Sequence, residues 1–188
     1  MPKYDFHNIL EPLEFEALVC DIVRTRDNIF IETYKEGRDL GIDGSYIKKG
    51  EKVIIQAKRY KDYKSLLYQL KNNELPKVRK LNPTRYILGV SIEFNPDQKN
   101  EILELFKGYI LDTSDIISAN NINDFFKDKK YKWIELNYHK LWMPSVNILS
   151  KILEEAAHKP IYKESSIELK EAFRTTDFFV PTRIYRQA

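Results

Sequence analysis

Apolar residues recur along the chain with two different spacings, and each spacing predicts a different kind of element. Over residues 12–24 they fall three or four positions apart, which predicts a helix with a proline in its first turn. Residues 28–34 alternate between apolar and polar and predict a first strand. Residues 45–48 and 52–58 are rich in β-branched or aromatic residues and flank Lys49-Gly50, so a β-hairpin with a two-residue turn is expected.

The pattern then changes back and forth between helix and strand. Residues 65–81 have helical spacing, but Pro76 is expected to break or kink this helix into two pieces. Residues 85–91 form a nearly continuous apolar run and predict a buried central strand. A capping signal predicts a helix over residues 95–106, and residues 115–118 predict the last strand. This order predicts an α/β fold with a mixed β-sheet flanked by helices.

A C-terminal helical extension is expected beyond this sheet. Residues 121–128 predict a short helix, and a second helix is expected over residues 144–157. Ser165 and Glu168 form a capping-box signature for a last helix. An aromatic and apolar group is expected to pack the extension against the sheet: Tyr131, Trp133, Tyr138, Leu141 and Trp142. The expected organisation is a core at residues 1–120, the extension at 121–160 and a helical linker at 161–188.

Composition narrows the class of protein. The chain has 188 residues, 43% hydrophobic and 31% charged, as is ordinary for a globular protein. No apolar run approaches the roughly 18 residues of a membrane span, and no signal peptide is recognised, so a cytoplasmic protein without a membrane segment is expected. Cys20 lies in an apolar run and is expected in the core. His7, His139 and His158 lack metal-ligand spacing, so zinc is not indicated.

Positive charge is modest in total and uneven in distribution. The formal net charge is +3, but basic residues gather at residues 58–64 and again at 77–80. The first group is interleaved with tyrosines, a composition that favours contacts to nucleic-acid phosphates. A solvated helix face remains the alternative. The candidate DNA-binding residues are Arg59, Lys61, Lys64, Lys77, Arg79 and Lys80.

The hairpin carries the candidate chemistry. The strand predicted at 52–58 has one apolar face and one face that ends in Gln56 and Lys58. A two-residue turn sets Asp43 across from Gln56 on that polar face. An acid, an amide oxygen and a lysine would then converge, which suits a divalent cation and chemistry on a phosphate.

Asp43 with Gln56-Ala57-Lys58 forms a D…QxK pattern that resembles the PD-(D/E)xK nuclease superfamily, and in particular its Mrr-like branch, in which glutamine stands in for the second acid. Phe15-Glu16-Ala17-Leu18 matches the F-E-x-L pattern that opens Mrr-like domains. The resemblance covers residues 1–120 and implies a restriction-endonuclease-like fold. It also implies hydrolysis of DNA with Mg²⁺, for which Mn²⁺ can substitute.

The resemblance assigns roles to the residues that match it. Asp43 is the expected central metal ligand, with Glu16 and Gln56 as further ligands and Lys58 orienting the attacking water or offsetting charge on the phosphate. Spacing by itself would leave Glu16 a solvated residue at the edge of an apolar stripe. Asp39 can also be considered as a ligand, but a role in capping its own loop is favoured.

Two segments near the C-terminus resemble the region between an Mrr-like nuclease domain and a STAND-type NTPase in bacterial antiviral defence proteins. They are LWMPSVNIL, from Leu141, and FFVPTRIYRQA, ending at Ala188. The resemblance implies an antiviral effector fused to an NTPase sensor and active as a homo-oligomer. The chain itself contains no G-x-x-x-x-G-K-[ST] phosphate loop. Two alternatives stay open, a DNA-binding module with a weak site and an oligomerisation module.

Overall fold

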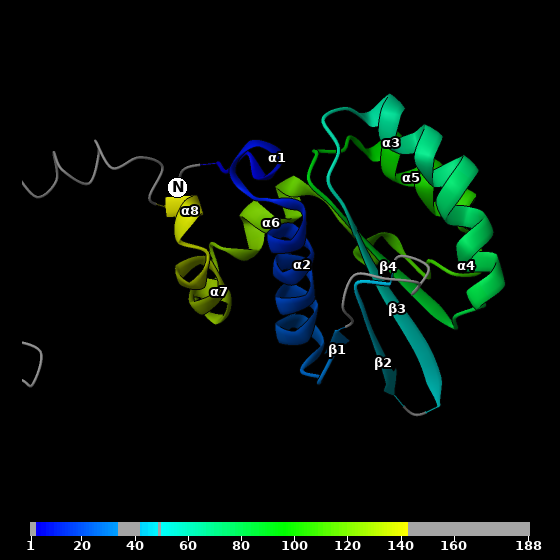
Figure 1. Cartoon of the computed structure of the whole chain (residues 1–188), viewed down its shortest axis with the longest axis horizontal. Helices are drawn as coiled ribbons and strands as arrows, with labels where there is room; N and C mark the ends of the chain where they lie inside the picture. The colour runs from blue at the N-terminus through cyan, green and yellow to red at the C-terminus, as the bar shows by residue number, and fades with distance from the viewer. Residues whose placement is uncertain (1–2, 34–41, 49, 143–188) are drawn as a thin grey trace, which may run out of the picture. The chain divides into compact units, whose positions relative to one another are not determined.

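The computed structural model describes residues 3–33, 42–48 and 50–142, which lie in one compact unit ending at Trp142. Its centre is a five-stranded sheet in the order β1-β2-β3-β4-β5 (Figure 1). The pairs β1-β2 and β2-β3 are antiparallel, whereas β3-β4 and β4-β5 are parallel. The predicted α/β class with a mixed sheet is therefore confirmed.

The strands are β1 (Glu32–Thr33), β2 (Gly44–Lys48), β3 (Glu51–Lys58), β4 (Arg85–Val90) and β5 (Ile116–Ile117). The helices before β4 are α1 (Phe6–Ile9), α2 (Pro12–Asp27), α3 (Tyr63–Gln69), the π-helix η1 (Leu70–Glu74) and α4 (Leu75–Leu81). The helices after β4 are α5 (Pro96–Leu105), the 3₁₀ turn η2 (Thr113–Asp115), α6 (Ala119–Phe125), the 3₁₀ turn η3 (Lys129–Tyr131), α7 (Lys132–Asn137) and α8 (His139–Trp142).

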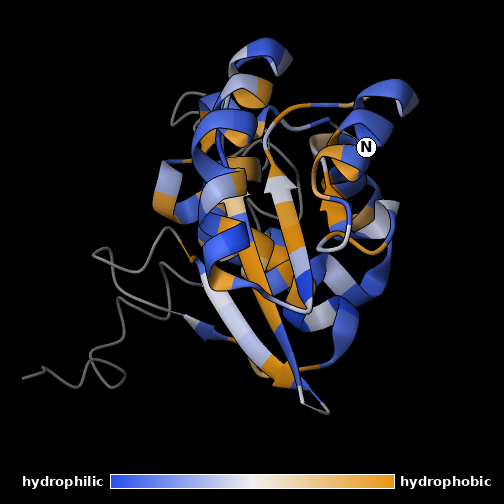
Figure 2. Ribbon diagram, turned by 90° about the vertical axis from the view of Figure 1, so that its right-hand side faces the viewer, coloured by the Kyte–Doolittle hydropathy of each residue, from blue (hydrophilic) through white to orange (hydrophobic). Residues whose placement is uncertain are grey.

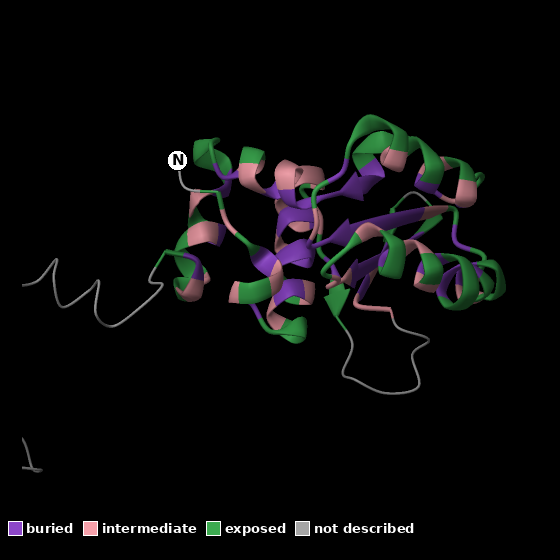
Figure 3. Cartoon of the chain, turned by 90° about the horizontal axis from the view of Figure 1, so that it is seen from above, coloured by how far each residue is buried: buried purple, intermediate pink, exposed green. Residues whose placement is uncertain are grey.

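Each face of the sheet has its own hydrophobic core. Val53, Ile55 and Ala57 of β3 belong to the core that includes the buried face of α2. Ile54 of β3 and Tyr86 of β4 belong to the opposite core, under α3, η1, α4 and α5. Figure 2 shows the hydrophobic strands enclosed by largely hydrophilic helices, and Figure 3 shows the central strands buried. Successive side chains of β3 therefore point alternately into the two cores.

The hairpin has the predicted register. Lys48 pairs with Glu51 and Gly44 pairs with Ile55. Gly50 has φ 86°, a left-handed conformation that glycine adopts without steric cost. Lys49, the other residue predicted for the turn, lies outside the described residues.

The first predicted strand is much shorter than the 28–34 that alternation suggested. Asn28 has φ 51° and ends α2, with its N–H donated to the Arg24 carbonyl, and the N–H of Ile29 bonds to the same carbonyl at 3.3 Å. These backbone groups complete the helix terminus and cannot also pair in a sheet. Strand pairing is therefore seen at Glu32–Thr33.

Residues 63–81 form two α-helical pieces, as predicted, but a π-helix joins them and Pro76 lies in the first turn of the second. The chain runs from α3 through η1 into α4, and the N–H of Leu75 bonds to the Leu70 carbonyl, five residues back. Proline has no N–H and its ring would clash with the carbonyl of Asn72 in a regular helix. The wider π turn accommodates Pro76 within one helical run.

The extension packs on α1 and α2, and its buried residues belong to the same hydrophobic core as Val53, Ile55 and Ala57 of β3, in line with the prediction. Segment η3 and α7 contact α2, and α8 contacts α1. Tyr131 and Leu141 are buried, and Tyr138 packs at the edge of the same core, but Trp133 and Trp142 are 43% and 46% exposed, so the prediction was wrong for these two. The helices predicted at 144–157 and after Ser165 lie outside the described residues.

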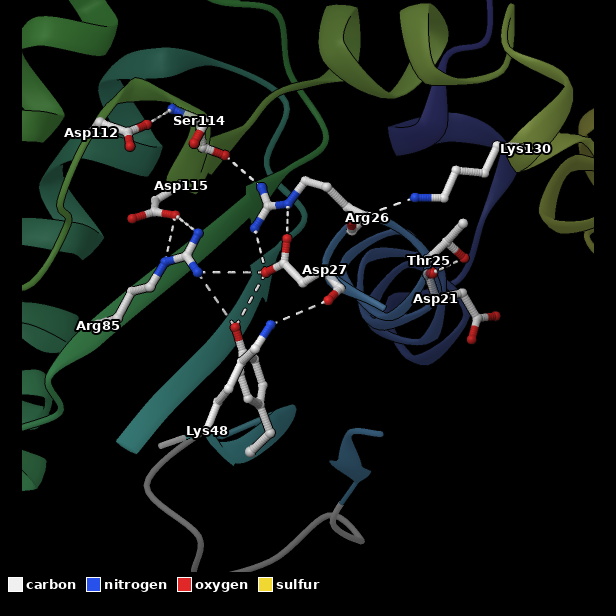
Figure 4. Close-up of polar contacts among 11 residues, drawn as sticks. Asp21, Thr25, Arg26, Asp27, Lys48, Arg85, Asp112, Ser114, Asp115 and Lys130 are labelled. Atoms are coloured by element: carbon white, nitrogen blue, oxygen red, sulfur yellow. Dashed lines mark hydrogen bonds and ion pairs between the residues drawn. The ribbon is translucent and has the colours of Figure 1, made fainter. Parts of the chain in front are cut away.

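A polar network joins α2 to the strands at the amino end of β4 (Figure 4). Arg85 donates two hydrogen bonds, of 2.9 and 2.6 Å, to one oxygen of the buried Asp115 carboxylate. Its Nη1 also lies 3.5 Å from Asp27, which accepts hydrogen bonds from Arg26 and Tyr46. Because each of these charges has an opposite partner, the network anchors the end of α2 without leaving a buried charge unpaired.

Within the described residues, no helix has both the length and the apolar character needed to cross a bilayer.

Candidate active site

The candidate site lies at the carboxyl end of β3, where β2 stops pairing with it. The ladder ends at Gly44 and Ile55, so Asp43 precedes it and is not a ladder partner of Gln56. The backbone N–H of Asp43 instead bonds to the Ile55 carbonyl at 3.2 Å. The carboxylate of Asp43 accepts a hydrogen bond of 2.5 Å from the N–H of Ala57, so a side chain takes over where the backbone ladder ends. This bond fixes the acid between the positions of Gln56 and Lys58 along β3.

Gln56 faces the core under η1 and α4, as period-2 alternation predicts. Its side chain is buried, and its amide oxygen accepts a hydrogen bond from the Tyr86 hydroxyl. Burial raises the pKa of Tyr86 well above its ordinary value, and the negative charges of Glu74 and Asp43 raise it further. Tyr86 therefore stays a protonated donor that orients the Gln56 oxygen.

Glu16 and Lys58 meet at one cavity of about 210 Å³, although they come from α2 and β3. Pro12 and Phe15 of α2 and residues Ala57, Arg59 and Tyr60 complete its lining. Glu16 and Lys58 are both partly buried. A larger hollow, of about 570 Å³, is lined by residues that include His7 and Lys61 and by no member of the D…QxK pattern.

Glu74 lies next to Lys58, and the sequence reasoning missed it. The Lys58 ammonium lies 3.3 Å from Glu74 Oε1, and Lys77 lies 3.2 Å from the same oxygen. Glu74 is 6% exposed at the end of η1. A signal was present, because Glu74 continues the four-residue spacing of buried residues at Leu66 and Leu70, where an apolar side chain is expected.

The donor atoms suit a hard cation. Glu16 and Asp43 offer carboxylate oxygens and Gln56 an amide oxygen, the ligand types that Mg²⁺ and Mn²⁺ take in proteins. Residues 3–33, 42–48 and 50–142 contain no group of three or more histidine, cysteine, aspartate or glutamate side chains placed to hold a metal ion.

The basic residues predicted to contact DNA fall into two groups. Lys61, Lys64, Arg79 and Lys80 are exposed. Lys77 is tied to Glu74, as described above. Arg59 donates from Nη1 to the carbonyls of His7 and Leu10, at 2.8 and 3.1 Å, and so holds α1 in place.

Two further predictions concern residues near Asp43. Cys20 is buried, as expected, with its sulfur 3.8 Å from the Asp43 carbonyl oxygen. Burial and the negative charge of Asp43 raise the pKa of its thiol from 9.0 to about 12, so it is not a nucleophile at neutral pH. Asp39 lies outside the described residues.

Two comparisons with known proteins find similar sequences. Residues 8–85 match the family model Mrr_cat, described as a restriction endonuclease. The uncharacterized protein y4cD of Sinorhizobium fredii (strain NBRC 101917 / NGR234) is 30% identical over 158 residues, which are 84% of this chain. The chain spans about a quarter of that relative, because the match covers 24% of its length. No solved structure shows significant similarity to the chain.

Proposed function

We propose, on the premise that residues 8–85 form a restriction endonuclease domain of the Mrr type, that this protein is a metal-dependent endonuclease that hydrolyses DNA phosphodiester bonds. The observation that carries the proposal is the meeting of Glu16 and Lys58 at one cavity beside the Asp43 carboxylate, which is fixed on Ala57 of the same cavity wall.

The residues of the site divide into cation ligands and a lysine that acts on the water or the phosphate. Asp43, Glu16 and Gln56 would hold the cation, and Mg²⁺ is the proposed ion. When bound, such an ion neutralises phosphate charge and lowers the pKa of a coordinated water. Lys58 orients the attacking water or offsets the negative charge that grows on the pentacoordinate phosphate. The water oxygen forms a bond to phosphorus and gives up a proton to solvent, the ester bond to the leaving oxygen breaks, and the leaving oxygen takes up a proton from solvent.

The exposed basic residues provide the DNA contact. Lys61 and Lys64 follow β3 directly, and Arg79 and Lys80 lie in α4, the helix after η1. Contacts from such residues go to phosphates and add affinity without reading sequence. We also propose that Lys77 and Arg59 contact phosphates, although each has a partner within the domain.

We further propose that the domain is the effector of an antiphage defence protein, fused to an NTPase sensor and active as a homo-oligomer. The resemblance of the segment LWMPSVNIL, from Leu141, and of the segment FFVPTRIYRQA, ending at Ala188, supports this. The match to part of a longer relative supports only that a domain like this one occurs within a longer chain. An oligomer-dependent nuclease gives a specific rate that rises with protein concentration. A specific rate independent of concentration, and unchanged by fusion to a dimeriser, would contradict this part of the proposal.

A plasmid assay tests the nuclease proposal. The purified protein is incubated with supercoiled plasmid in Mg²⁺, in Mn²⁺ and in chelator, and we expect nicked or linear DNA with either metal and intact plasmid in chelator. Lys58→Ala should lower the rate by about 10²–10³-fold, the usual effect of losing one charge-stabilising group.

Lys52→Ala is the matched control for that variant. Lys52 also lies on β3, but it is exposed and hydrogen-bonds to the Leu81 carbonyl away from the cavity. DNA binding without cleavage would favour the binding module. Neither binding nor cleavage, in a protein that self-associates, would favour the oligomerisation module.

A further inference from the structure

Glu74 is a buried carboxylate whose presence the site described so far does not explain. Its side chain is 8% exposed. One oxygen, Oε1, lies within ion-pair distance of Lys58 and Lys77. The other, Oε2, is buried and has no hydrogen-bond partner among the described residues. A buried charge therefore lies against the lysine of the D…QxK pattern.

A contribution to stability does not by itself explain a buried carboxylate at position 74. Removing a carboxylate from water is costly, and two ion pairs on a single oxygen offset that cost incompletely while the second oxygen lacks a donor. The neighbouring buried positions on this helical run, Leu66, Leu70 and Val78, are apolar. An apolar residue at position 74 would fill the same space without the cost.

The π turn keeps Glu74 in line with those apolar residues. A spacing of four residues drifts steadily around a regular α-helix, which has 3.6 residues per turn. The wider turn at Leu70–Glu74 offsets that drift. Glu74 therefore stays on the helix face that covers β3 and faces Lys58. Turns of this kind are frequent at functional sites.

We propose that Glu74 is the positioning residue for Lys58. The proposal rests on the proposed function, because it takes Lys58 to be the lysine that acts on the phosphate. The ammonium of Lys58 is carried on a flexible four-carbon chain, and the residue also lines the cavity that Glu16 lines. Glu74 holds the ammonium in one place, and Lys77 balances the remaining charge of the carboxylate.

Glu74→Gln tests the role of the charge, because glutamine keeps the shape of the side chain. Lys58 and Lys77, whose side chains are 20% and 38% exposed, can turn towards solvent, so the variant is expected to fold. We expect kcat for plasmid cleavage to fall about 10²-fold, the effect of misplacing a reacting group by about 1 Å. The KM for DNA should change much less, since Glu74 is buried and does not contact DNA. Glu74→Asp should restore part of the rate.

Glu135→Gln is the matched control. Glu135 lies in α7, away from the proposed site. Its side chain is 12% exposed, is paired with Lys132, and accepts a hydrogen bond from the Tyr4 hydroxyl. This variant should lower the melting temperature without lowering kcat. A role of Glu74 confined to stability would make the two glutamine variants behave alike.

A double-mutant cycle measures the contact without any nuclease assay. Melting temperatures are compared for Lys58→Met, Glu74→Gln and the double variant. We expect non-additive shifts, because the two side chains interact. Additive shifts, or a folded Glu74→Gln that cleaves at the wild-type rate, would overturn the proposal. A wild-type protein that cleaves no DNA would instead overturn the proposed function, so the two failures are distinguishable.

Discussion

The carboxylate of Asp43 accepts a hydrogen bond of 2.5 Å from the backbone N–H of Ala57. Asp43 lies one residue, and Ala57 two residues, beyond the last pair of the β2-β3 ladder, Gly44 with Ile55. A strand N–H that loses its backbone partner needs another acceptor. Here that acceptor is Asp43, the acid of the D…QxK pattern. The hydrogen bond that replaces backbone pairing at the end of the hairpin therefore also positions the acid.

Asp43 variants should therefore separate folding from catalysis. The asparagine side chain in Asp43→Asn still offers an oxygen to the Ala57 N–H but has no negative charge. We expect a melting temperature near that of wild type, weaker Mn²⁺ binding by calorimetry, and cleavage reduced by about 10²–10³-fold. Asp43→Ala leaves the Ala57 N–H unpaired and should also cost about 1–3 kcal/mol of unfolding free energy. Equal stabilities of the two variants would show that the hydrogen bond does not matter.

The hairpin register could be predicted from the sequence because two independent constraints agreed. Alternation along 52–58 fixed which residues face each core, and Gly50 allowed a two-residue turn. Together they placed Gly44 opposite Ile55. The predicted pairing of Asp43 with Gln56 was wrong, because pairing rules do not say where a ladder ends and a side chain replaces the backbone partner.

Glu74 could not be assigned from the sequence for a different reason. Its spacing showed that it lies on a buried face, but the strand residue it would meet depends on how the helix after β3 crosses the sheet. Pro76 predicts two helical pieces, but it does not predict that a π turn joins them and brings Glu74 to Lys58. Tertiary packing, which no local pattern contains, determined this contact.

Gly89 is expected to be intolerant of any side chain. A Cβ at this position would lie 2.5 Å from both methyl groups of Val19, because α2 packs directly on β4 there. Gly89→Ala should destabilise the protein by about 1–3 kcal/mol, as overpacked cores do. Chemical denaturation would measure this. Val19→Ala should relieve the clash, so the double variant should lose less than the sum of the two single losses; simple additivity would contradict the close packing.

The Asp27 carboxyl should make stability sensitive to acid. Burial raises its pKa, but hydrogen bonding and charge from Arg26, the charge of Arg85 and the Tyr46 hydroxyl outweigh burial and hold the pKa below 3.8. Folding therefore favours the ionised form. The stabilisation is present above the unfolded-state pKa and is lost as the pH falls through the lower folded-state pKa.

Asp27→Asn tests this linkage. The variant should have a lower melting temperature than wild type at neutral pH, and the difference should shrink as the pH falls below 3.8. Asp124→Asn is the control, because that carboxylate is 65% exposed and its ion pair with Lys127 contributes little. A difference between Asp27→Asn and wild type that is constant across the pH range would contradict the assignment.

The basic residues after β3 should bind DNA phosphates and not simply solvate a helix. Lys61 and Lys64 are exposed, and no described acidic side chain forms an ion pair with either. The double variant Lys61→Ala/Lys64→Ala should weaken binding to every duplex alike and reduce the salt slope by about 0.9 per lost phosphate contact, or about 2 in total. Fluorescence anisotropy in chelator measures this without cutting the DNA. Lys107→Ala/Lys127→Ala removes the same charge from exposed lysines paired with Glu104 and Asp124 and should leave the slope unchanged. If the two double variants bind alike, bulk charge explains the affinity and residues 58–64 are a solvated surface.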